Sequence, residues 1–105
     1  ADWCKRCVDQ LALMRDLQQR YGEANLRVLA VNIDPHEQPA RDAARRLGIT
    51  VLHDADQSVV RQYDPSTLPF AVLVDPHGTV RHVHAGYRAD DATTYADELA
   101  ALILE

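Results

Sequence analysis

The sequence is poor in cysteine, lysine, tryptophan and phenylalanine, and it contains no long apolar run. No stretch approaches the roughly 20 apolar residues of a membrane-spanning helix, and no basic segment followed by an apolar one opens the chain as in a signal peptide. The formal net charge is −5, so the chain lacks the basic excess typical of nucleic-acid-binding proteins. At 105 residues it is long enough to bury a core without structural disulfides.

The apolar pattern predicts one α/β domain over residues 1–105. Helical spacing marks residues 4–21 and 40–47, and a brief helix follows Asp54 or Asp56, either of which can cap it. A last helix, capped by Asp90 or Asp91, carries apolar residues as far as Ile103. The remaining segments are extended: buried strands at 26–33 and 70–74, a short piece at 49–52, and a hairpin partner at 79–85. No repeat, low-complexity tract or linker interrupts this order, which predicts a three-layer sandwich.

Both cysteines belong to one motif, Trp3-Cys4-Lys5-Arg6-Cys7, at the start of the first predicted helix. Positions i and i+3 of a helix place their Cβ atoms roughly 5–6 Å apart. A disulfide needs roughly 3.5–4.5 Å, which the softer geometry of a first turn can supply. A bridge this short closes almost no loop and stabilises the fold very little. The motif therefore favours redox chemistry over a structural role.

The position of the motif assigns different roles to its two cysteines. Cys4 falls at the helix N-terminus, where free N–H groups and the positive end of the dipole favour a thiolate. Lys5 and Arg6 add cations that lower the pKa of Cys4 further. Cys4 is the predicted nucleophile, and Cys7, one turn inward, is the predicted resolving thiol. The two cations also stabilise the dithiol form, which predicts a more oxidising couple than neutral residues would give.

The same motif occurs with the segment VLAVNID at 28–34, with Thr67-Leu68-Pro69-Phe70 before a strand, and with DPHG at 75–78. Together these resemble the thioredoxin superfamily, and more narrowly the TlpA/ResA-like branch of bacterial thiol–disulfide oxidoreductases. The resemblance covers nearly the whole chain. It implies a thioredoxin-like three-layer sandwich with a mixed central sheet. Because that branch is membrane-anchored or secreted, it also implies an extracytoplasmic bacterial location, although one CxxC pair fits a cytoplasmic protein as well.

The resemblance also implies a substrate-binding face around the thiols. It implies that the Leu68–Pro69 bond is cis and faces Cys4, and that the backbone of Leu68 pairs with a substrate segment as an added strand. Trp3 would line the same face, in addition to being a partly buried aromatic residue. Gly86 and Tyr87 form either part of this rim or a simple turn.

Three features depart from the family pattern. The family places a central strand directly before the motif, whereas Ala1-Asp2 is only the tail of such a segment. We therefore expect an N-terminally incomplete domain in which the strands at 26–33 and 70–74 lie too far apart to pair. Lys5-Arg6 lacks the proline common before the second cysteine. Gln10 occupies the place where relatives often carry a glutamate, and Asp9 is adjacent at the wrong spacing.

The function expected from these residues is thiol–disulfide exchange with protein disulfides or dithiols and a redox partner, by a monomer without a cofactor. The alternative is a non-catalytic thioredoxin-like binding module whose cysteines hold a metal or act as a redox switch. His82 and His84 share one side of a strand, but they are distant in sequence from the cysteines and predict a solvated face, so no metal site is predicted. A peroxidase is disfavoured because no Pro-x-x-x-Thr-x-x-Cys pattern precedes the thiol.

Overall fold

The computed structural model describes residues 5–65 and 67–105. The elements in chain order are α1 (Lys5–Tyr21), η1 (Gly22–Ala24), β1 (Leu29–Asn32), α2 (Gln38–Leu47), β2 (Thr50–His53), α3 (Ser58–Tyr63), β3 (Phe70–Val74), β4 (Val80–Ala85) and α4 (Asp91–Ile103). The predicted helices and strands are therefore present, with boundaries shifted by a few residues. Within the described ranges no helix is long and apolar enough to cross a bilayer.

The main core forms where α1, β3 and α4 meet. Its buried members are Leu17 from α1, Leu73 from β3, and Tyr95 and Leu99 from α4. Tyr95 is the most deeply buried, with no exposed surface. Burying a side chain of this size contributes roughly 1.5–3 kcal/mol, so these four residues hold α1 and α4 together on one side of β3.

The strands form two separate two-stranded sheets. β1 runs parallel to β2, from the pair Leu29↔Thr50 onward, and β3 runs antiparallel to β4, from the pair Phe70↔Ala85 onward. β1 and β3 are not hydrogen-bonded to each other, which confirms the expectation that the strands at 26–33 and 70–74 do not pair. The expected mixed sheet is present only as these two small sheets, one parallel and one antiparallel, because no described strand lies between β1 and β3 to join them.

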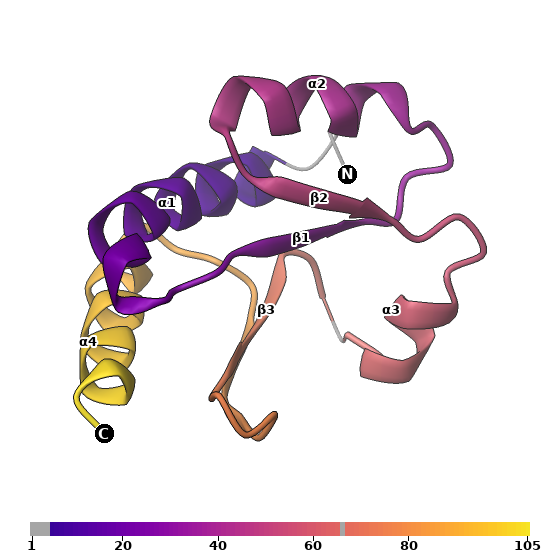
Figure 1. Ribbon diagram of the computed structural model, residues 1–105. Coiled ribbons are helices and arrows are strands. Elements are labelled where there is room, and N and C mark those ends of the chain that lie inside the picture. The colour runs from indigo at the N-terminus through magenta and orange to yellow at the C-terminus, as the bar shows by residue number, and fades with distance from the viewer. Residues whose placement is uncertain (1–4, 66) are drawn as a thin grey trace.

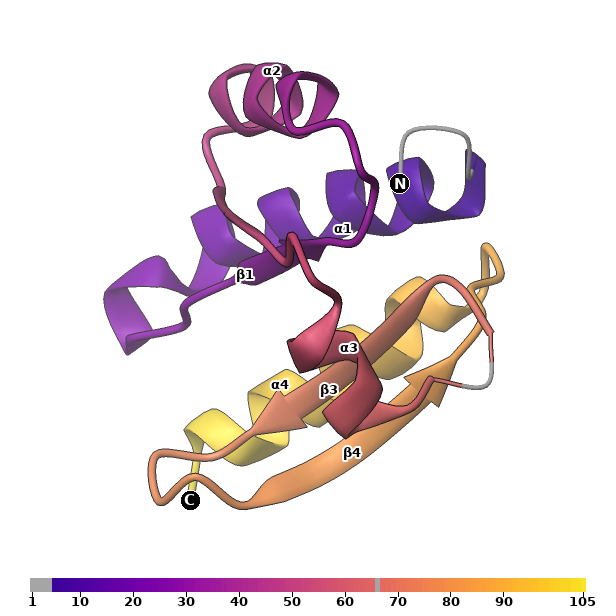
Figure 2. The ribbon, with the colours of Figure 1, turned by 90° about the vertical axis from the view of Figure 1, so that its right-hand side faces the viewer.

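Figures 1 and 2 show how the helices surround the strands. α4 lies on one side of the β3–β4 pair and α3 on the other, while α2 lies over β2. α1 runs along the same side as α4, and its N-terminal end approaches the loop that joins β4 to α4. This approach brings the first turns of α1 beside the residues that follow β4.

Local interactions explain the end of α2 and the start of α3. Gly48 ends α2 in a left-handed conformation (φ 68°), and its N–H donates to the carbonyl of Ala44 at 2.8 Å. Asp54 caps α3 as predicted, since its carboxylate accepts the backbone N–H groups of Val59 and Val60. A 3₁₀ turn follows α1, and Asn25 rather than Gly22 adopts the left-handed conformation there (φ 70°).

Candidate active site at the start of α1

The first turn of α1 carries the described part of the cysteine motif. Trp3 and Cys4 lie outside the described residues. Lys5 and Arg6 are exposed, whereas Cys7 is only 9% exposed. Cys7 is disulfide-bonded rather than a free thiol. In the described residues, the Cys7 side chain is therefore buried at the start of α1, and the two cations that precede it in the sequence are exposed.

The segment before β3 is tied to the loop after β4. The Leu68–Pro69 peptide bond is cis, as the resemblance implies. Pro69 is buried, Leu68 is half-buried, and the carbonyl of Pro69 accepts the N–H of Gly86 at 2.8 Å. This bond extends the β3–β4 pairing by one step and fixes the loop after β4 against Pro69.

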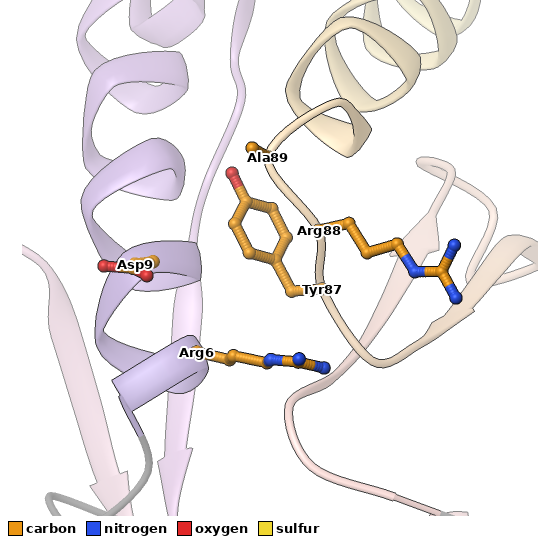
Figure 3. Close-up of a pocket in the computed structure, with 5 residues that line it drawn as sticks. All are labelled: Arg6, Asp9, Tyr87, Arg88 and Ala89. Atoms are coloured by element: carbon orange, nitrogen blue, oxygen red, sulfur yellow. The ribbon is translucent and has the colours of Figure 1, made fainter.

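A cavity of about 510 Å³ lies between the start of α1 and that loop. Its lining residues are Arg6, Asp9, Tyr87, Arg88 and Ala89. Figure 3 shows the Arg6 side chain extending from α1 toward the loop, the Tyr87 ring standing between the loop and α1, and Arg88 on the opposite side of the loop. The sequence singled out Gly86 and Tyr87 as a possible rim. It gave no signal for Arg88, and it noted Asp9 only as a nearby carboxylate.

The cavity is rich in unpaired hydrogen-bond donors. The guanidinium groups of Arg6 and Arg88 form no ion pair with any described residue. Arg88 is engaged through its backbone, because its N–H donates to the carboxylate of Asp91 at 2.7 Å and its carbonyl accepts the N–H of Asp91 at 3.0 Å. Burial, together with the charges of Asp91 and Asp9, raises the pKa of Tyr87. The phenol of Tyr87 therefore stays protonated at neutral pH and remains a donor.

Behind the cavity, Gln10 and Tyr95 connect the helix start to the core. Gln10 is 7% exposed and donates from Nε2 to the Tyr95 hydroxyl at 3.1 Å. The rings of Tyr87 and Tyr95 meet edge to face at 6.0 Å, and the ring of His84 lies 4.4 Å from that of Tyr95. Burial is the largest cause that raises the pKa of Tyr95. These contacts hold Tyr87 in place from the inner side.

The strand face that carries His82 and His84 is covered rather than solvated. His84 Nε2 lies 2.6 Å from Glu98 Oε2, and His82 Nδ1 lies 3.5 Å from Glu98 Oε1. The side chain of His84 is only 19% exposed. The expectation of a solvated face was therefore wrong for His84, because α4 packs across β4 and presents Glu98 to both rings. Among the described residues, no three histidine, cysteine or acidic side chains are grouped to hold a metal.

A model of the AhpC/TSA family matches residues 1–83. The chain belongs to the AhpC/TSA family. The thiol-disulfide oxidoreductase ResA of Geobacillus kaustophilus is 29% identical to this AhpC/TSA-family chain over 86 residues, covering 80% of the chain and 49% of the relative. The chain spans about half the length of the curated relatives it matches.

Two solved structures show the same fold. A putative thiol:disulfide interchange protein DsbE from Chlorobium tepidum superposes with a TM-score of 0.88 at 26% identity, covering 96% of this chain and 73% of that one. A thioredoxin-like protein solved in its oxidised form superposes with a TM-score of 0.77 at 20% identity, covering 93% and 71%. The AhpC/TSA-family chain therefore has a thioredoxin-like α/β fold, and its similar proteins include thiol–disulfide oxidoreductases.

Proposed function

We propose that this chain is a thiol–disulfide oxidoreductase that exchanges a Cys4–Cys7 dithiol or disulfide with protein substrates. The observation that carries the proposal is Cys7, which is disulfide-bonded, little exposed and located in the first turn of α1. The similarity to ResA and to the DsbE-like protein supports the same class of reaction. Cys4 and Cys7 are the only cysteines in the sequence, so the exchange needs both.

In the reductive direction, the Cys4 thiolate attacks one sulfur of a substrate disulfide and expels the other as a thiolate, which takes up a proton. This step forms a mixed disulfide between Cys4 and the substrate. The Cys7 thiolate then attacks the sulfur of Cys4 and releases the second substrate thiol. Two electrons pass to the substrate, and the Cys4–Cys7 disulfide remains. The low exposure of Cys7 fits the second step, because the attack then comes from inside the protein.

The neighbouring residues have proposed roles in binding and in tuning the thiol. Lys5 and Arg6 stabilise the Cys4 thiolate, since both are exposed cations that follow Cys4 directly in the sequence. Trp3, Leu68 and Pro69 form the surface that receives the substrate. The bond from Gly86 to the Pro69 carbonyl supports this assignment, because it joins the Pro69 segment to the loop beside Arg6.

The proposal extends to the setting of the reaction. The substrates are protein disulfides or dithiols, a separate redox partner regenerates the pair, and the exchange requires no cofactor. We place the protein outside the bacterial cytoplasm, by its similarity to the TlpA/ResA-like branch.

Disulfide reduction in insulin tests the proposal. The reduced protein should cleave insulin disulfides, and Cys4→Ser should abolish the activity while leaving the circular dichroism spectrum unchanged. Cys7→Ser should instead accumulate a mixed disulfide that mass spectrometry detects. An inactive wild-type protein that binds zinc or copper stoichiometrically would favour the binding module in its place.

A further inference from the structure

We propose that the cavity between α1 and the β4–α4 loop selects disulfide substrates that carry an acidic side chain close to the reacting cysteine. The inference rests on the proposed function, and it adds a substrate class to that function. It depends on the residues that line the cavity, which are contributed by the first two turns of α1 and by the loop after β4.

Some surface arginines of the described chain are neutralised: Arg41 pairs with Glu37, and Arg81 pairs with both Asp75 and Glu105. Others form no ion pair with a described residue, and the two arginines of the cavity belong to this second group. Arg6 and Arg88 flank the loop without such a partner among the described residues. In a chain with a net charge of −5, acidic groups are plentiful, yet none of those that the structure describes neutralises these two guanidinium groups. A carboxylate arriving with the substrate would supply the missing charge.

The hydroxyl of Tyr87 is a further hydrogen-bond donor of the cavity. It has no hydrogen-bond partner in the described part of the chain, and its raised pKa keeps it protonated. The edge-to-face contact with Tyr95 fixes the ring before any substrate arrives. A donor held in this way can bind a carboxylate oxygen with little loss of side-chain entropy.

The same cavity also contains a negative charge, on Asp9. Asp9 is the acidic lining residue, so Arg6, Arg88 and Asp9 together leave one positive charge. Asp91 lies close by but is engaged with the backbone of Arg88. The preference for an acidic substrate should therefore be moderate. Reversing the charge of Arg88 should weaken this preference, and neutralising Asp9 should strengthen it.

The experiment uses two otherwise identical disulfide peptides, one with glutamates and one with lysines flanking the cysteines. The measured quantity is the ratio of kcat/KM for the acidic peptide to that for the basic peptide at low salt. We expect the wild type to favour the acidic peptide by about 3- to 10-fold, with the preference shrinking as salt rises. Arg88→Glu should lower the ratio at least about 3-fold, and Asp9→Asn should raise it about 2-fold.

Arg46→Glu is the matched control. Arg46 is an exposed arginine near the end of α2, and the adjacent carbonyl of Gly48 accepts a hydrogen bond from Gln18. Gln18 lies twelve residues beyond Arg6 on α1, about 18 Å along the helix axis. Arg46→Glu changes the net charge as Arg88→Glu does, so an effect of overall charge would appear equally in both variants.

Each outcome decides between the two proposals. A wild-type protein that reduces neither peptide contradicts the proposed function itself. A wild type that reduces both peptides equally, with a ratio that neither Arg88→Glu nor Asp9→Asn alters, overturns the selectivity and leaves the function standing. If Arg88→Glu and Arg46→Glu change the ratio of kcat/KM equally, the proposed selectivity of the cavity is also overturned. Because Asp9→Asn is a separate variant, the test remains decisive even if Arg88→Glu fails to fold.

Discussion

Gln10 donates from its side-chain amide to the hydroxyl of Tyr95 at 3.1 Å, and so joins α1 to α4 across 85 positions of sequence. Both residues are buried, and Gln10 is three residues beyond Cys7. The amide takes the place where the TlpA/ResA-like branch often carries a glutamate. A neutral side chain satisfies the buried phenol here without the desolvation that a carboxylate would suffer. The bond fixes the helix start that carries the motif.

Tyr95→Phe should therefore destabilise the protein by about 1–3 kcal/mol, because it removes the hydroxyl and leaves the Gln10 amide without its acceptor. Urea unfolding followed by circular dichroism measures the free energy of unfolding. Tyr63→Phe is the control, since Tyr63 is 52% exposed and its change should stay within about 0.5 kcal/mol. Equal effects of the two substitutions would show that the Gln10 bond contributes nothing.

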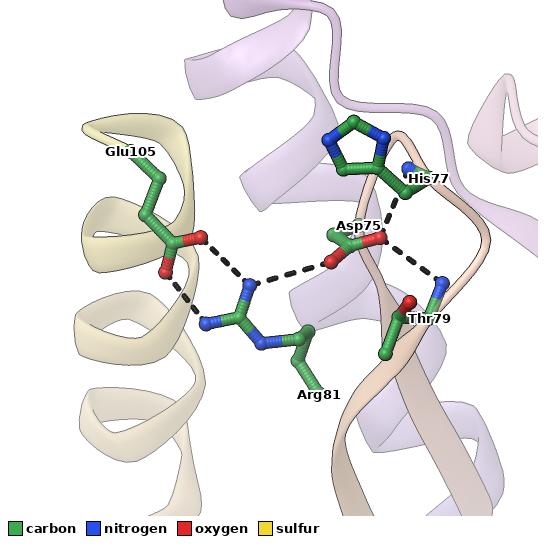
Figure 4. A network of polar contacts seen from close by, with 5 residues as sticks. All are labelled: Asp75, His77, Thr79, Arg81 and Glu105. Atoms are coloured by element: carbon green, nitrogen blue, oxygen red, sulfur yellow. Dashed lines mark hydrogen bonds and ion pairs between the residues drawn. The ribbon is translucent and has the colours of Figure 1, made fainter.

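The turn between β3 and β4 should make stability depend on pH in acid. The N–H groups of Thr79 and His77 donate to Asp75, Arg81 pairs with it, and these contacts hold the pKa of Asp75 below its usual value (Figure 4). A carboxyl with a depressed pKa stabilises the fold above its unfolded pKa, and this contribution is lost as the pH falls through the folded pKa. The loss should therefore begin below about pH 4.

Asp75→Asn removes this titration, so its Tm should fall less than that of the wild type between pH 6 and pH 3. Thermal unfolding at several pH values measures the difference. Asp97→Asn is the control, because Asp97 is an exposed residue of α4 that forms no hydrogen bond or ion pair with the described residues. An Asp75→Asn variant whose Tm falls as steeply as that of the wild type would contradict this assignment.

Local sequence signals were enough to place most elements and caps. Glycine at the end of α2 and Asp54 before α3 act through their own backbone neighbourhood, so the sequence could predict them. The alternation of His82 and His84 correctly put both on one face of β4. The alternation could not predict the contact between His84 and Glu98. Glu98 lies 14 residues further along the chain and reaches His84 only because α4 packs across that face of β4.

The candidate site was predicted only in part, for the same reason. The motif and Pro69 were recognisable from their residues and from the family resemblance. Arg88 carries no signal of its own, and its nearness to Arg6 depends on how α1 approaches the β4–α4 loop. The lack of pairing between β1 and β3 was predicted from the departure from the family pattern, whereas the strand pattern alone leaves open which strands lie side by side.

Gly48→Ala should destabilise the protein by about 1 kcal/mol. Gly48 has a φ of 68°, which alanine adopts only with strain, although a Cβ there would meet no atom within 4 Å. Gly22→Ala is the matched control, because its Cβ would be equally unobstructed and its φ is not in the left-handed region. Urea unfolding should show a change within about 0.5 kcal/mol for Gly22→Ala. Similar losses in both variants would rule out backbone strain as the cause.

Removing the two cations of the motif should make the couple more reducing. Lys5 and Arg6 are exposed, so each contributes only a modest interaction with the Cys4 thiolate, which belongs to the reduced form. The double variant Lys5→Gln/Arg6→Gln should lower the reduction potential by about 10–20 mV, measured by equilibration with glutathione. Arg46→Gln, which removes a charge near the opposite end of α1, should leave the potential unchanged. An unchanged or higher potential in the double variant would show that these cations do not stabilise the thiolate.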